Sequence, residues 1–349
     1  MRPKDVLLVL KQFDISIQNV SFKSIHQGLI NDTFLISDNG SPLYILQQIN
    51  THVFKDYIGL HQNLELALQQ LHAEDYQSIK IIKNRDNQPY SIYNGEVWRL
   101  QSYVTNSIAH DFATNAKIAF ESGRILGRFH GLLKNENLND YKTTIPNFNH
   151  LPYRVKEFET ALISAKKTRL ISAKNEIHFA QQLIPKLLTF YNLNLPLRLC
   201  HNDTKLNNFL FSKTDKALCL IDLDTVMPGY FHYDFGDAVR TIVSESIEGE
   251  LNRSKINFNS NYFEAFIKGL KASHLQLSKN EIAQLPLAIS LMPFMHGLRA
   301  LTAYLNGNIY YKVAYDSQNL ERCTSLFYVA DLGVIHSDTT KTIIATYLL

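Results

Sequence analysis

The chain of 349 residues has few cysteines, a small net charge and no run of five basic residues. Its three cysteines, Cys200, Cys219 and Cys323, are scattered and show no CxxC spacing. This pattern argues against a disulfide framework or a zinc site, and it is typical of a reducing compartment. The net charge of +3 is too small to predict binding to nucleic acid.

Long apolar segments are also scarce. The N-terminal apolar run covers only residues 6–10 and has no cleavage-site pattern, so we expect no signal peptide. The most apolar long stretch, residues 285–303, contains two prolines, a histidine and an arginine. It therefore predicts a buried core helix with a break, not a membrane span. We expect a cytoplasmic protein with no membrane partner.

What is present suits a folded protein of two lobes. The hydrophobic fraction is 45% and the charged fraction 19%, and twenty Phe and eighteen Tyr supply bulk for a core. A chain of this length exceeds one average domain. No internal repeat or low-complexity tract interrupts it.

The first hundred residues favour strands. Residues 15–24 alternate apolar and polar side chains, and residues 33–36 and 44–46 are short β-rich runs around a turn. A helix is expected over about 53–73, and Asp111 is expected to cap a helix that runs to about 135. Further strands are expected near 78–82, 97–104 and within 197–222; further helices are expected near 174–192, 231–247, 259–272, 279–306 and 315–332.

These elements predict an α+β fold with two lobes. Residues 1–103 would form a small β-rich N-terminal lobe with one helix. Residues 104–349 would form a larger, mainly helical lobe that holds a β-hairpin.

The predicted hairpin carries the chemistry. Asp203 is followed five positions later by Asn208, then by strands at 209–211 and 217–221, and then by Asp222. A hairpin returns the end of its second strand to the start of its first, so Asn208 and Asp222 are expected side by side. Asp203 would face a substrate hydroxyl, while Asn208 and Asp222 would offer oxygen ligands to Mg²⁺. Phosphoryl transfer needs such positioning and charge neutralisation more than covalent help.

The same residues carry a resemblance to a known family. His201-x-Asp203, four residues and then Asn208 resembles the loop that protein kinases and aminoglycoside phosphotransferase-like kinases share. The longer series resembles the N-acetylhexosamine 1-kinase group, in matches that run in order from about residue 25 to 325. These matches include residues 28–34, 46–50, 98–100, 201–208, 217–229, 233–237, Arg240 and 299–307.

The resemblance implies a bilobal protein-kinase-like fold that uses ATP and Mg²⁺. It implies Asp203 as the catalytic residue that contacts the sugar hydroxyl, with Lys205 beside the γ-phosphate. The remaining implied contacts are Gly28, Asn31 and Thr33 for the phosphates; Ser102, Tyr103 and Val104 for adenine; Asn208, Asp222 and Asp224 for the metal; and His26, Arg299 and Tyr310 for the sugar.

Two features depart from a generic kinase. The third predicted strand carries Gln47 where many kinases of this fold carry a lysine or arginine for the phosphates. The glycine-rich loop has only Gly28. In addition, residues 234–236 spell the Asp-Phe-Gly metal motif but lie well past the hairpin, so we interpret Asp234 as a helix cap or a brace for the loop.

Several alternatives stay open. Asp224 is equally well interpreted as a second metal ligand or as a structural acceptor, and Arg299 as a ligand contact or half of an internal ion pair. We expect His201 to hydrogen-bond the backbone. The leading function is an ATP-dependent kinase of the anomeric hydroxyl of an N-acetylhexosamine, GlcNAc or GalNAc. The alternatives are a kinase of homoserine, choline or an aminoglycoside, and a non-catalytic nucleotide-binding module. The expected partners are therefore a small-molecule sugar and a nucleotide, and the chain is expected to be a monomer or a weak homodimer.

Overall fold

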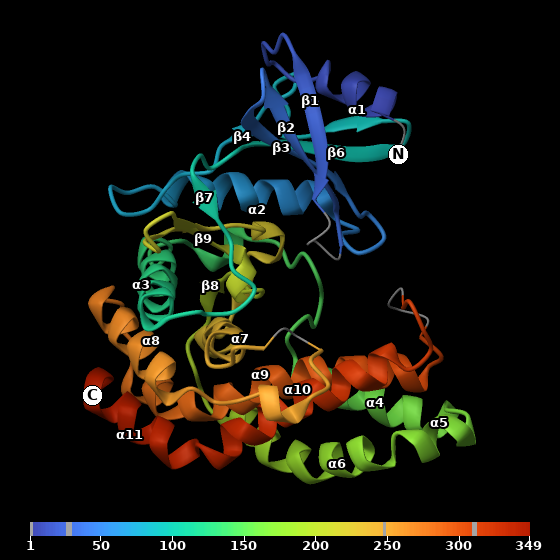
Figure 1. Cartoon of the computed structure of the whole chain (residues 1–349), viewed down its shortest axis with the longest axis vertical. Helices are drawn as coiled ribbons and strands as arrows, with labels where there is room; N and C mark the ends of the chain where they lie inside the picture. Colours follow the sequence, from blue (N-terminus) through green and yellow to red (C-terminus); the bar gives the residue numbers. More distant parts are fainter. Residues whose placement is uncertain (1–2, 26–29, 247–248, 309–312) are drawn as a thin grey trace.

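The computed structural model describes residues 3–25, 30–246, 249–308 and 313–349. They form an N-terminal lobe built on a sheet, above a larger and mainly helical C-terminal lobe (Figure 1). The N-terminal lobe contains α1 (Pro3–Leu10), β1 (Val20–Ile25), β2 (Asp32–Asp38), β3 (Ser41–Ile49), α2 (Tyr57–Gln70), β4 (Ile81–Ile82), β5 (Ser91–Tyr93) and β6 (Glu96–Ser102). This architecture confirms the predicted α+β fold class.

The C-terminal lobe follows β6. Its strands are β7 (Ser107–Ile108), β8 (Arg198–Cys200), β9 (Phe209–Ser212), β10 (Ala217–Leu220) and β11 (Met227–Gly229). Its α-helices are α3 (Ala116–Leu132), α4 (Leu151–Ser164), α5 (Lys167–Ser172), α6 (Lys174–Leu188), α7 (Phe231–Ile242), α8 (Ser260–Ala272), α9 (Lys279–Leu305), α10 (Gln318–Ile335) and α11 (Ser337–Leu348). The predicted boundary after residue 103 lies just past the end of β6 and stays a prediction.

The strands of the N-terminal lobe form one antiparallel sheet in the order β1-β2-β3-β6-β4, with β5 also paired to β6. Alternate residues of β3 and β6 point into one core. Leu46, Trp98 and Leu100 are fully buried there, where they pack with Val9 and Phe13 at the start of the chain. Burial of such side chains contributes about 1.5–3 kcal/mol each, which fixes the register of the sheet.

Helix α2 links the two lobes. Asp56 begins it, because its side chain accepts a hydrogen bond from the Gly59 N–H at 2.8 Å. Leu64 and Leu71 on its inner face belong to the same buried core as Phe209 and Phe211 of β9. The helix that was expected over 53–73 therefore occupies Tyr57–Gln70 and lies directly above the hairpin (Figure 1).

Two local predictions about the C-terminal helices are wrong. Asp111 is exposed, and α3 begins instead at Asn115, whose side chain accepts from the Ile118 N–H at 3.0 Å. The expected break within 285–303 is absent, since α9 runs without interruption through Pro286 and Pro293. A proline removes one helical hydrogen bond, but α9 is buried on most of its surface, and packing against its neighbours offsets that loss.

Among the described residues, no helix is long and apolar enough to cross a membrane. All three cysteines are buried and free.

Candidate active site

The β9–β10 hairpin brings the two predicted metal ligands together. Phe209 pairs with Leu220, and beyond this pair the Ile221 N–H donates to the Asn208 carbonyl at 2.9 Å. Asn208 and Asp222 therefore flank the open end of the hairpin, as its geometry predicts. Asp222 has φ 62° and ψ 52°, a left-handed conformation that non-glycine residues adopt only under constraint.

Asp203 lies at the same end of the hairpin. The Asn208 side-chain amide donates to the Asp203 carbonyl at 2.7 Å and to its carboxylate at 3.1 Å. The Lys205 ammonium lies 3.2 Å from the same carboxylate. The Asn208 nitrogen is thus used by Asp203, and its side-chain oxygen is the atom that can serve a cation.

The charged groups of this cluster shift the pKa values of Lys205 and Asp222. Burial alone lowers the pKa of Lys205, but Asp203 and Asp222 more than reverse this and raise it. Burial, together with the carboxylates of Asp224 and Asp203, raises the pKa of Asp222 to about 6. Lys205 therefore stays charged, while the ionised form of Asp222 is disfavoured unless another cation joins the cluster.

This arrangement fits a divalent cation. A half-buried carboxylate crowded by two others, beside an amide oxygen, is an all-oxygen donor set of the kind Mg²⁺ prefers. Asn208 and Asp222 would hold the ion, which would relieve the repulsion and neutralise phosphate charge when bound. These roles stay predictions.

Asp224 is occupied in a different way. Its Oδ1 lies 2.6 Å from an Arg99 guanidinium nitrogen, and its Oδ2 accepts from the Asn31 side chain at 2.7 Å. Arg99 and Asp224 are 1% and 2% exposed, so the pair is fully desolvated. These contacts support the structural-acceptor interpretation of Asp224, and its metal role stays a prediction.

Asp234 is a brace for the loop from His201 to Asn208. Its carboxylate accepts from the His201 N–H at 2.8 Å, from the Asn202 N–H at 2.6 Å and from the His130 ring at 2.9 Å. It does not cap α7, which starts at Phe231 after Tyr230. The brace interpretation is therefore confirmed and the cap interpretation is wrong, because Asp234 lies a turn inside the helix with its carboxylate facing the loop.

His201 behaves as predicted. Its ring nitrogen contacts the Ile221 carbonyl at 2.8 Å, which ties the loop to the hairpin. Asn202 adopts φ 66°, and its side chain donates to the carbonyls of Cys200, Thr225 and Met227. These hydrogen bonds fix the backbone just before Asp203, as the positioning of a reacting group requires.

The predicted nucleotide contacts are spread along the N-terminal lobe. Asn31 faces Asp224, and the Thr33 hydroxyl accepts from the Gln47 side chain at 3.4 Å. Among the predicted adenine contacts, the Ser102 and Tyr103 N–H groups donate to the carbonyls of Lys80 and Leu43, which leaves Val104 as the nearest candidate donor for a base. The Val104 carbonyl accepts from Ser107.

Of the three predicted sugar contacts, only Arg299 lies among the described residues. His26 and Tyr310, like the predicted phosphate-loop residue Gly28, lie outside the described residues. Arg299 is half-buried on α9, with its guanidinium 5.0 Å from the centre of the Phe148 ring. This cation–π contact is an arrangement that neither of the two sequence interpretations of Arg299 included.

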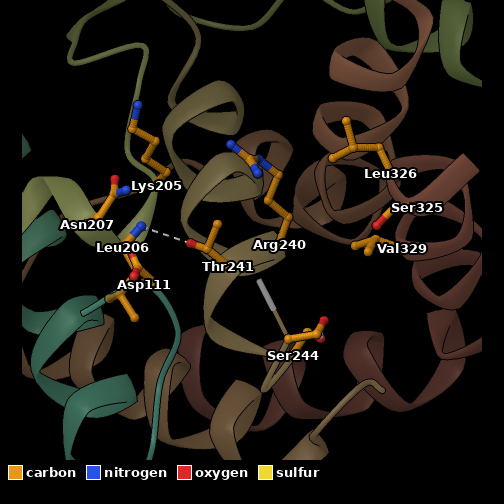
Figure 2. A pocket seen from close by; sticks show the side chains of 11 residues that line it. Asp111, Lys205, Leu206, Asn207, Arg240, Thr241, Ser244, Ser325, Leu326 and Val329 are labelled. Carbon is orange, nitrogen blue, oxygen red and sulfur yellow. Dashed lines mark hydrogen bonds between the residues drawn. The ribbon is translucent and has the colours of Figure 1, made fainter. Parts of the chain in front are cut away.

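A cavity of about 280 Å³ adjoins the loop. In Figure 2, Arg240 of α7 stands between Lys205 and the α10 residues that close the far side. The Leu206 N–H donates to the Thr241 hydroxyl at 2.9 Å along the floor (Figure 2). Its remaining lining residues are Asp111, Asn207, Ser244, Ser246, Ser325, Leu326 and Val329.

Sequence reasoning missed two groups of residues. Arg99 was seen only as part of a matching run, although an arginine between the apolar Trp98 and Leu100 in a strand is itself a signal. Asp237 accepts from Arg240 at 2.7 Å and contacts His296 at 3.0 Å. Burial alone raises the pKa of Asp237, but Arg240 and His296 hold it below its usual range, so this carboxylate stays charged beside Arg240, which lines the cavity.

A hairpin that carries Asn208 and Asp222, a braced Asp203 loop and a sheet lobe above them define a kinase-like phosphotransferase. Comparison with known families agrees, because residues 21–265 match the phosphotransferase enzyme family. The chain belongs to this family.

Solved structures share the fold across almost the whole chain. A microcompartment-associated aminopropanol kinase matches with a TM-score of 0.68 at 17% identity, over 97% of this chain and 99% of that one. An amicoumacin kinase in complex with AMP-PNP and Ca²⁺ matches with a TM-score of 0.62 at 14% identity, over 95% and 94%. Choline kinase from Cryptosporidium parvum matches with a TM-score of 0.59 at 14% identity, over 99% of each chain. At these identities the likeness shows the fold and not the acceptor.

Proposed function

We propose that the protein transfers the γ-phosphoryl group of ATP, with Mg²⁺, to the anomeric hydroxyl of an N-acetylhexosamine. The observation that carries the proposal is the joint placement of Asp203, Asn208 and Asp222 around the open end of the hairpin. Lys205 and Asn207 of the same loop line a neighbouring cavity. The family supports phosphoryl transfer, and the resemblance to the N-acetylhexosamine 1-kinase group supports the acceptor.

In this mechanism the oxygen of the C1 hydroxyl attacks the γ-phosphorus, and Asp203 accepts the proton of that hydroxyl. The bond from that phosphorus to the β-phosphate oxygen breaks, and ADP leaves. Lys205, held 3.2 Å from Asp203, keeps the carboxylate oriented and meets the transferred phosphoryl oxygens. Asn208 and Asp222 would hold Mg²⁺, which would supply charge neutralisation when bound.

The cavity supports a neutral acceptor with many hydroxyls. Four residues with hydroxyl groups, Thr241, Ser244, Ser246 and Ser325, line it. Ser244 and Ser246 hydrogen-bond each other at 2.7 Å and the Thr241 hydroxyl accepts from the Leu206 N–H, so these groups would serve a sugar through their remaining donor and acceptor capacity. Its two cationic side chains are each matched by a carboxylate, since Lys205 pairs with Asp203 and Arg240 with Asp237. A sugar offers hydroxyls to such a lining without the cost of burying a charge.

The second candidate is a kinase of an amino alcohol, which the names of the aminopropanol and choline kinases favour. An acceptor screen with ATP and Mg²⁺ separates the two. We expect turnover with GlcNAc or GalNAc and at least tenfold less with choline, aminopropanol and homoserine at equal concentration. Preferred turnover of an amino alcohol would refute the sugar assignment, and nucleotide binding without turnover of any acceptor would favour a non-catalytic module.

A further inference from the structure

Arg99 is a buried cation that no part of the proposed mechanism uses. Arg99 lies on β6 directly opposite Gln47 of β3. The side-chain amide oxygen of Gln47 accepts a hydrogen bond from one of the terminal guanidinium nitrogens of Arg99 at 2.6 Å. Its other terminal nitrogen lies 2.6 Å from Asp224. Its Nε is buried without a hydrogen-bond partner.

The pair spans the two lobes. Arg99 belongs to the N-terminal sheet, whereas Asp224 lies in the 3₁₀ turn Leu223–Thr225 that follows Asp222. Asn31, at the end of the predicted phosphate loop, donates to the other Asp224 oxygen and accepts from the Asn50 N–H. One carboxylate thus connects Asn31, the sheet and the turn that carries Asp222.

This contact also accounts for the uncharged residue on β3. Directly opposed residues of an antiparallel pair lie close enough for like charges to repel each other. A lysine or arginine in place of Gln47 would face the Arg99 guanidinium inside the lobe. A neutral glutamine instead accepts a hydrogen bond from it, so the cation of this site stands on β6 and not on β3.

We infer that Arg99 is a positioning residue for the nucleotide phosphates and their metal, and that it acts by holding Asp224 and hence the Asp222 turn against the sheet. The inference rests on the proposed function, because it needs a nucleotide between the lobes. It makes Asp224 an acceptor for Arg99 and Asn31, with Asp222 and Asn208 left to hold the ion.

The test measures nucleotide affinity by calorimetry, without turnover. The probes are Mg²⁺ with AMP-PNP, which reports on the phosphate end, and metal-free AMP, which reports on the base. For Arg99→Gln we expect about tenfold weaker binding of Mg²⁺ with AMP-PNP and unchanged binding of AMP, a loss within the usual range of coupling between sites. Arg85→Gln, an exposed arginine of the same lobe, is the matched control and should bind both probes like wild type.

A relocated cation provides the second arm. The double variant Arg99→Gln with Gln47→Arg returns a guanidinium to the same pair of strands. We expect it to recover at least threefold of the lost affinity for Mg²⁺ with AMP-PNP. Arg99→Lys keeps the charge but cannot reach both Gln47 and Asp224 as the guanidinium does. We expect it to bind Mg²⁺ with AMP-PNP more weakly than wild type and AMP equally well, and this comparison with wild type keeps the test informative if Arg99→Gln proves too unstable to purify.

The outcomes separate the inference from the function on which it rests. If wild type binds neither AMP-PNP nor AMP, the proposed function fails. If wild type binds both and folded Arg99→Gln binds Mg²⁺ with AMP-PNP equally well, only the role of Arg99 is overturned. An equal loss of affinity for both probes, or an exchange variant no better than Arg99→Gln, would show a merely structural arginine.

Discussion

At the scale of single residues, the proposed mechanism assigns the general base to Asp203. The Asn208 side chain donates a hydrogen bond to the Asp203 carboxylate, and Lys205 pairs with it. We therefore expect the side chain at position 203 to keep its place when its charge is removed. We expect Asp203→Asn to lower kcat about 10²–10⁴-fold, the usual contribution of a general base, with affinity for ATP within about twofold of wild type. Steady-state rates and calorimetry test this, with the exposed Asp140→Asn as control. Wild-type turnover by Asp203→Asn would refute the mechanism.

We expect the ionised Asp222 carboxylate to destabilise the metal-free protein and to bind the metal ion. Its ionised carboxylate is disfavoured by burial and by Asp224 and Asp203. In metal-free solution near neutral pH, Asp222→Asn should therefore be more stable to urea by about 1 kcal/mol, as removal of a repulsive buried charge predicts. The same variant should need far more Mg²⁺ for half-maximal activity. A variant that is less stable without metal and keeps the wild-type Mg²⁺ requirement would exclude Asp222 as the ligand.

At the scale of elements, α3 and α8 touch through glycines. A methyl group on Gly123 would lie 2.0 Å from the Phe266 carbonyl oxygen, and one on Gly269 would lie 1.8 Å from that of Phe120. We expect Gly123→Ala to cost about 1–3 kcal/mol of unfolding free energy by overpacking, as measured in urea.

Gly131 is the matched control for this contact. It lies on the same helix, and a methyl group there meets no atom within 4 Å. Gly131→Ala should stabilise the protein by about 0.5–1 kcal/mol through helix propensity. Equal effects of the two substitutions would show that the α3–α8 contact is looser than described.

The contact between α7 and α9 is expected to depend on pH. Burial lowers the pKa of His232 to about 4, while its ring donates to the Glu281 carbonyl at 2.9 Å. Since the unfolded chain has the higher pKa, the stabilisation is complete above pH 6.5 and is lost as pH falls towards 4. This one histidine should cost about 2 kcal/mol of stability between pH 7 and pH 5.

Urea unfolding of His232→Gln at both pH values checks this expectation. The variant can still donate a hydrogen bond to Glu281, and its loss of stability between pH 7 and pH 5 should be smaller than that of wild type by about the same 2 kcal/mol. An equal pH dependence of the two proteins would mean that His232 titrates normally.

At the scale of the whole molecule, the sequence predicts the helices and strands better than the packing between elements that are distant in the chain. The hairpin followed from turn residues between two apolar runs, and it brought Asn208 and Asp222 together as expected. Such local patterns depend on neighbours in the chain. The continuity of α9 through Pro286 and Pro293 depends on packing from distant helices, which no local pattern reports.

The same distinction holds within the candidate site. The spacing of His201, Asp203 and Asn208 predicts a kinase-like loop from the chain alone, and the roles of Asp203 and Lys205 stay predictions. The pairing of Arg99 with Asp224 joins residues 125 positions apart, and it supports the structural-acceptor interpretation of Asp224, one of two that the sequence left equal. Long-range pairing of buried charges is specified by the assembled fold and leaves only a weak local signal, a charged residue in an apolar strand.

The central claim concerns which hydroxyl receives the phosphoryl group. The most direct measurement compares GlcNAc and GalNAc with their 1-O-methyl glycosides, with ATP and Mg²⁺ and the phosphorylated carbon identified by NMR. We predict phosphate on C1 of at least one free sugar and no product from its methyl glycoside. Equal turnover of a sugar and its glycoside, or phosphate on another carbon, would contradict it.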